Sequence, residues 1–66
     1  MTIYDFCNLC TSDLHDICIY DMTTEKEVFN GTISDAMYSD YADYEVLSFD
    51  LEYSKKEYLC LNIETE

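Results

Sequence analysis

The sequence contains no arginine and only three lysines, Lys26, Lys55 and Lys56, against fifteen aspartates and glutamates. The formal net charge is −12 on 66 residues. Such a chain has almost nothing with which to neutralise a row of phosphates, so direct binding to nucleic acid is disfavoured. An anionic membrane surface is disfavoured for the same reason. The partners that suit this charge are basic surfaces, and association with them should be fast and sensitive to salt.

Glycine and histidine each occur once, at Gly31 and His15. Without a glycine-rich segment the chain has no phosphate-binding loop, and its acidic stretches lack the glycine turn of a calcium-binding loop. Cysteines lie near His15, but a chain this short cannot enclose a substrate and shows no glycines for an oxyanion hole. We therefore expect His15 to be a surface residue, and we expect no enzyme activity and no cofactor.

Long apolar runs are also missing, and the N-terminus lacks the basic region of a signal peptide. These features predict a cytoplasmic protein in which the four cysteines are reduced thiols. Apolar residues make up 48% of the chain and are spread along its length, which favours a folded protein over a disordered one. The length indicates one small domain covering residues 1–66.

The spacing of apolar residues predicts six elements in the order α-β-β-α-β-β. Thr2 is the expected N-cap of the first helix, with Asp5 in its first turn, and Ser34 is the expected N-cap of the second. Gly31, inside a strand pattern, indicates a bulge or a close approach by another backbone. The expected helices cover residues 3–11 and 35–41, and the expected strands cover residues 15–22, 28–33, 45–53 and 57–64.

The last two strands alternate clearly between apolar and polar residues. Leu47, Phe49, Leu51 and Tyr53 share one side, and residues 54–56 form the expected hairpin turn. These patterns predict an α+β fold with an antiparallel sheet or a small barrel. A chain this short leaves much apolar surface and open strand edges, so we also expect a homodimer or a higher oligomer.

Four potential metal ligands lie close together in the N-terminal part of the sequence. Cys7, Cys10, His15 and Cys18 have the spacing C-x2-C-x4-H-x2-C, which resembles the zinc knuckle of retroviral nucleocapsid proteins, C-x2-C-x4-H-x4-C. The last spacing is two residues shorter, and the glycines and basic residues of a knuckle are missing. Cys7 and Cys10 also fit the apolar stripe of the first helix, where reduced cysteine packs as a small hydrophobe. We therefore predict no metal, with a zinc-stabilised module as an alternative.

The stretch SDAMYSDYADYEV, residues 34–46, combines tyrosines with carboxylates and contains no basic residue. Tyrosine is favoured at the centres of protein interfaces, because it offers a large contact area with few rotatable bonds. Carboxylates around it would suit a basic groove of the kind that binds nucleic acid. One alternative is that a tyrosine and Met37 fill the core while the rest is a solvated face. The predicted partner-binding residues are Asp35, Tyr38, Asp40, Tyr41, Asp43 and Tyr44.

A very short acidic chain with many tyrosines and no enzyme motif resembles the small proteins of bacteriophages and mobile elements, including anti-CRISPR and anti-restriction inhibitors. Many of these are nucleic-acid mimics, whose carboxylates stand in for phosphates. The resemblance implies a non-enzymatic inhibitor in the host cytoplasm that occupies a basic surface on a nuclease or a nucleic-acid-binding complex. A small oligomeric domain that sequesters a small molecule or a nucleotide signal is an alternative.

Overall fold

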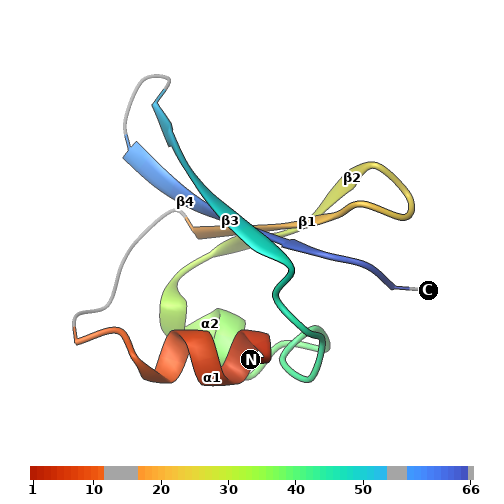
Figure 1. Cartoon of the computed structure of the whole chain (residues 1–66). Coiled ribbons are helices and arrows are strands. Elements are labelled where there is room, and N and C mark those ends of the chain that lie inside the picture. Colours follow the sequence, from red (N-terminus) through yellow and green to blue (C-terminus); the bar gives the residue numbers. More distant parts are fainter. Residues whose placement is uncertain (12–16, 54–56, 66) are drawn as a thin grey trace.

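The computed structural model describes residues 1–11, 17–53 and 57–65 (Figure 1). The element order is helix, two strands, helix, two strands, which confirms the predicted α+β class. The predicted turn at residues 54–56 lies outside the described residues. The elements are α1 (Ile3–Asn8), β1 (Ile17–Asp21), β2 (Lys26–Gly31), α2 (Ile33–Met37), β3 (Ser48–Tyr53) and β4 (Glu57–Ile63).

The four strands form one open sheet in the order β2-β1-β4-β3. Both hairpins are antiparallel, but β1 and β4 pair in parallel at the centre, with Cys18 beside Cys60 and Ile19 beside Leu61. The sheet is therefore mixed rather than wholly antiparallel, and it does not close into a barrel. Parallel neighbours need a long connection, which α2 and the turns after it provide here.

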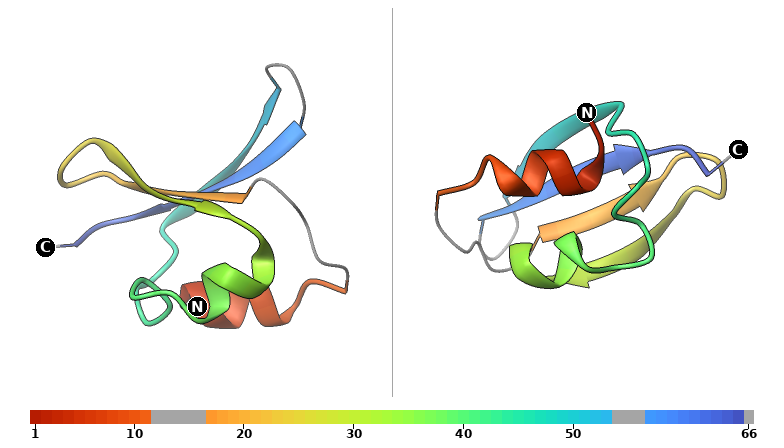
Figure 2. Two further views of the ribbon diagram at one scale, coloured as in Figure 1. Left: turned by 180° about the vertical axis from the view of Figure 1, so that it is seen from behind. Right: turned by 90° about the horizontal axis from the view of Figure 1, so that it is seen from below.

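Both helices lie under the same face of the sheet, α1 toward β3 and β4 and α2 toward β2 (Figures 1 and 2). Strand residues alternate between faces, so the apolar positions of the central strands meet the helices. The C-terminal end of β3 and the N-terminal end of β4 rise away from the helices, as Figure 1 and the left view of Figure 2 show. The buried core consists of Ile3, Cys7, Ile17, Ile19, Ile33, Ala36, Leu61 and Ile63.

Both helices are shorter than their patterns predict. Asn8 rather than residue 11 ends α1, and the second helix begins after Thr32 rather than Ser34. The Thr32 backbone is extended and its hydroxyl accepts a hydrogen bond from the Asp35 N–H at 3.1 Å, which fixes the N-cap. At the other end the Ser39 hydroxyl donates to the Ala36 carbonyl at 2.8 Å, and the chain leaves the helix after Met37.

Gly31 does not form the predicted bulge. The register between β1 and β2 shifts between Ile19 and Tyr20, whose partners are Phe29 and Glu27, so the extra residue is residue 28, three positions before Gly31. The close approach at Gly31 is real, but it involves a side chain. A Cβ atom there would lie 3.0 Å from Cζ of Phe29, so glycine leaves room for that ring.

Candidate interaction surface

The predicted partner-binding residues lie in a stretch that we call the acidic-tyrosine segment, residues 35–45. Its first residues belong to α2, and the rest forms consecutive turns that are fixed to the start of α1. The first N–H groups of a helix have no partner within the helix. Those of Ile3 and Tyr4 donate to the carbonyls of Tyr44 and Ala42, both at 2.9 Å. These hydrogen bonds hold the segment as a loop against α1, so it does not continue α2 as a longer helix.

The three tyrosines of this segment have different surroundings and do not form one helical face. Tyr38 is 82% exposed, whereas Tyr41 packs against the core. Tyr44 is 37% exposed, and its ring centre lies 5.8 Å from that of Tyr41. Tyr38 is thus the ring offered most openly to a partner, Tyr44 is offered in part, and Tyr41 mainly supports the loop.

The three aspartates of the segment have no cationic partners in the described part of the chain. Asp35, Asp40 and Asp43 are exposed. The one ion pair among the described residues joins the Met1 ammonium to Glu45 at 2.7 Å. The hydrogen bond to Glu45 raises the pKa of that amino group, so the pair persists at neutral pH. The three aspartates therefore leave unneutralised negative charge on the segment that carries Tyr38.

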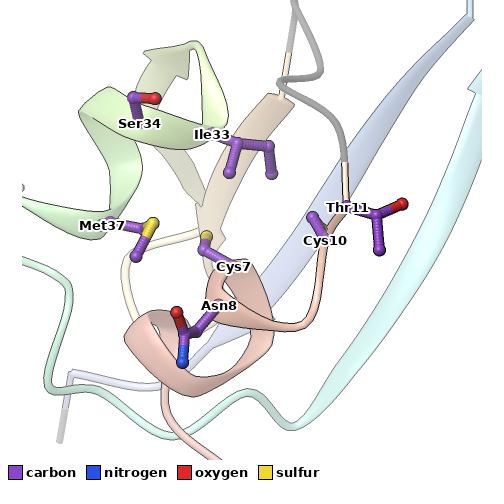
Figure 3. A pocket seen from close by; sticks show the side chains of 7 residues that line it. All are labelled: Cys7, Asn8, Cys10, Thr11, Ile33, Ser34 and Met37. Atoms are coloured by element: carbon purple, nitrogen blue, oxygen red, sulfur yellow. The ribbon is translucent and has the colours of Figure 1, made fainter.

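A shallow pocket of about 240 Å³ lies between α1 and α2. Figure 3 shows Cys7 and Met37 facing it from the two helices, with Asn8 and Ser34 as polar neighbours. Enclosed ligand sites are usually larger, about 300 to 1,000 Å³. None of the described residues that line this pocket is a lysine, so none of them offers a cation to a nucleotide phosphate. The pocket gives little support to the alternative of small-molecule sequestration.

The cysteines do not come together as one metal site. Cys7 belongs to the core between the helices and the sheet, whereas Cys18 faces the opposite side of β1 and pairs with Cys60. His15 lies outside the described residues. Groups of three or more metal-ligating side chains are absent from residues 1–11, 17–53 and 57–65. The sheet therefore separates two of the predicted ligands, which does not suit one tetrahedral zinc ion.

The thiols also lack the character of an activated nucleophile. Burial, with a smaller effect from Cys10, raises the pKa of Cys7 to about 11. Burial also raises the pKa of Cys18, helped by its contact with Cys60 and by the negative charge of Glu27. Reactive cysteines have lowered pKa values and partial exposure. Cys7 packs in the core, as the apolar stripe of the first helix predicted, and Cys18 is buried as well.

Sequence reasoning missed one feature of this surface, the uncovered apolar side of β3. The alternation of Leu47, Phe49 and Leu51 is present, but these side chains are 51%, 60% and 52% exposed. Phe49 is held by Phe6 of α1, with ring centres 5.5 Å apart. We call the adjoining apolar cleft of about 390 Å³ the β3 groove. Its lining residues are Met1, Phe6, Val46, Leu47, Ser48 and Phe49.

Comparison with known proteins gives no relative from which a function can be transferred. No family model, curated protein or solved structure matches the chain. Within the described ranges, no helix has the length and apolar character needed to cross a membrane.

Proposed function

We propose that this chain is a non-enzymatic inhibitor that docks on a basic surface of a larger protein, with a nuclease or nucleic-acid-binding complex as its target. The proposal includes a location in the cytoplasm of a host cell, which is what the phage-type resemblance of the sequence implies. The inhibitor competes with nucleic acid for the same basic surface. Its carboxylates take the positions of phosphates, and its fold blocks the surface sterically.

One observation carries the proposal: Asp35, Asp40 and Asp43 are exposed on the same short segment as the open ring of Tyr38, and no ion pair joins them to a cation among the described residues. An exposed tyrosine ring offers a partner a large contact area with few rotatable bonds. In a basic groove it would contact the aliphatic stems and charged heads of lysine or arginine. The hydrogen bonds to α1 fix the conformation of the loop before binding, which lowers the entropic cost of docking.

The roles within the acidic-tyrosine segment can be separated by mutation. Tyr38→Ala should leave the unfolding free energy within about 0.5 kcal/mol of the wild type, because its ring is exposed. It should speed dissociation from the target about 30-fold, which corresponds to about 2 kcal/mol for a hot-spot ring. Tyr41→Ala is the matched control: loss of a ring packed on the core should lower stability before it affects binding.

The triple variant D35N/D40N/D43N tests the charges. It should slow association and weaken its salt dependence, while the folded domain becomes as stable as the wild type or more so. Binding kinetics against the target isolated on the immobilised chain, together with thermal melts, measure both effects. An unchanged dissociation rate for Tyr38→Ala combined with unchanged association for the triple variant would exclude this segment as the docking face.

A further inference from the structure

The β3 strand has two open sides. It is an outer strand of the sheet, so its far edge has no neighbouring strand among the described residues. Phe49 and Leu51 of β3 and the preceding Leu47 are each more than half exposed. Figure 2 shows that the ends of β3 and β4 rise away from the helices. An exposed apolar edge strand normally pairs with another strand. This combination points to a binding partner at β3 that is separate from the acidic-tyrosine segment.

The lining of the β3 groove indicates what kind of occupant it takes. The described residues that line the groove are apolar except Ser48, whose hydroxyl lies on the other face of the strand and accepts a hydrogen bond from the Asn62 amide. The Met1 ammonium at the rim is already paired with Glu45. Asp50 projects from the other face of the strand, where it accepts a hydrogen bond from the Asn62 amide at 3.0 Å. No unneutralised carboxylate therefore lines the groove, so an apolar occupant suits it better than a basic one.

We propose that a second copy of this chain occupies the site, by antiparallel pairing of β3 with β3. The same strand then supplies both the edge and the apolar side chains, as a two-fold interface requires. With the two-fold axis at Phe49, the two Phe49 rings meet and Leu47 lies opposite Leu51 of the second copy. On the other face Ser48 lies opposite Asp50 of the second copy.

Neighbouring registers are less favourable for identifiable reasons. An axis at Asp50 sets that carboxylate directly against its own copy, and like charges in opposite positions destabilise a strand pair. A shift by one residue places Phe49 opposite Asp50 and mixes the two faces of the strand. The register centred on Phe49 keeps apolar residues opposite apolar ones and joins the two β3 grooves into one surface.

The size of the molecule is consistent with an interface of this kind. A standard interface takes about 800 Å² from each partner. The whole chain exposes 4452 Å², so the dimer would cover roughly a fifth of its surface. This inference goes beyond the proposed function, since it names a different surface and a different partner. The two also respond oppositely to salt: screening strengthens an association between two copies of charge −12 and weakens binding to a basic target.

Sedimentation equilibrium of the full chain between 0.05 and 0.5 M NaCl, a range of about one decade in ionic strength, tests the dimer. The wild type should form a dimer whose Kd falls as salt rises. Leu51→Asp should weaken the dimer about 30-fold or more, by placing a charge in an apolar contact. Leu51→Lys should weaken it as well, although it lowers the negative charge. Met22→Asp is the control, because Met22 is 47% exposed in the turn between β1 and β2 and should leave the dimer unchanged.

Several results would overturn the inference. A wild type that stays monomeric at high micromolar concentration throughout the salt range would do so, and this result does not depend on any variant. A dimer that survives both Leu51 substitutions would place the contact elsewhere. A Leu51→Lys dimer as tight as the wild type would show that charge alone, not apolar pairing, governs association. Loss of target binding in the Leu51 variants without loss of the dimer would assign the β3 groove to the target.

Discussion

At the scale of single residues, Asp21 is a buried carboxylate that links the end of β1 to the following turn and to Thr65. It is 2% exposed at the end of β1, and its carboxylate accepts hydrogen bonds from the turn that follows and from Thr65. The Thr65 hydroxyl donates at 2.8 Å, and the Thr24 hydroxyl and Thr23 N–H each donate at 3.0 Å. Burial alone would raise the pKa of Asp21, but the hydrogen bonds from Thr65, Thr23 and Thr24 outweigh it and lower that pKa.

This network gives stability a defined pH dependence. Since the folded-state pKa of Asp21 lies below that of about 3.9 in an unfolded chain, the ionised carboxylate stabilises the fold above about pH 4. The contribution is lost as pH falls through the lower folded-state value. Asp21→Asn should therefore lower Tm at pH 7, and the difference from the wild type should shrink in acid, where protonated Asp21 resembles the amide.

Thermal melts from pH 7 to pH 2 would measure this difference, over a range that spans the usual titration of aspartate at about pH 4. Asp43→Asn is the matched control: it also removes one negative charge, but from an exposed position. It should not lower Tm at pH 7. A Tm difference between Asp21→Asn and the wild type that stays constant across the range would contradict the role of ionised Asp21.

At the scale of elements, α1 has only six residues, so its ends determine whether it forms. The Thr2 hydroxyl accepts from the Asp5 N–H at 3.1 Å, and the Asp5 carboxylate accepts from the Thr2 N–H at 3.1 Å. This reciprocal pair is the capping box that the sequence predicted. It also holds the first turn of α1 in position to receive the acidic-tyrosine segment.

Thr2→Ala removes one half of this capping box and should lower the unfolding free energy by about 1 kcal/mol. For a domain of this size, that corresponds to a fall in Tm of about 4 to 8 °C. Thr2→Ser keeps the hydroxyl and should remain close to the wild type. Equal losses in the two variants would show that the methyl group of Thr2, rather than its hydroxyl, supports the helix.

The six elements were predictable because short-range patterns determine them, whereas the sheet order was not. The Thr2 cap and the alternation from Leu47 to Leu51 are visible in the sequence. The parallel pairing of β1 with β4 joins residues about forty positions apart, as with Cys18 and Cys60. No local pattern encodes that choice. For the same reason the sequence placed Leu47, Phe49 and Leu51 on one face but could not show how much of that face the helices cover.

The exposure of that face follows from the lengths of the elements. A helix of six residues is about 9 Å long, whereas a strand of seven residues spans about 23 Å. Two short helices therefore cover only part of a four-stranded sheet.

The sequence predicted the candidate site only in part. Asp35, Asp40 and Asp43 are exposed as expected, whereas Tyr41 packs inward. The turns that contain Tyr41 depend on hydrogen bonds to α1, and α1 is far from these turns in the sequence.

At the scale of the whole molecule, two surfaces with different chemistry lie side by side. The acidic-tyrosine segment continues directly into Val46 and Leu47 of the β3 groove, and Met1 contributes to both through Glu45 and through the groove lining. A dimer through β3 would therefore present two acidic-tyrosine segments on one particle. Two linked sites bind a repeated or symmetric target more tightly than one site does, provided that both can engage at once.

The claim that the chain occupies a nucleic-acid-binding surface is tested most directly by capture from a bacterial lysate on the immobilised protein, with duplex DNA as competitor. The account predicts that the wild type retains a nuclease or nucleic-acid-binding protein, that DNA displaces it, and that a salt gradient elutes it. D35N/D40N/D43N should retain much less, while Met22→Asp retains as much as the wild type. Retention by the wild type that neither DNA nor salt reduces, or equal retention by the triple variant, would contradict the account.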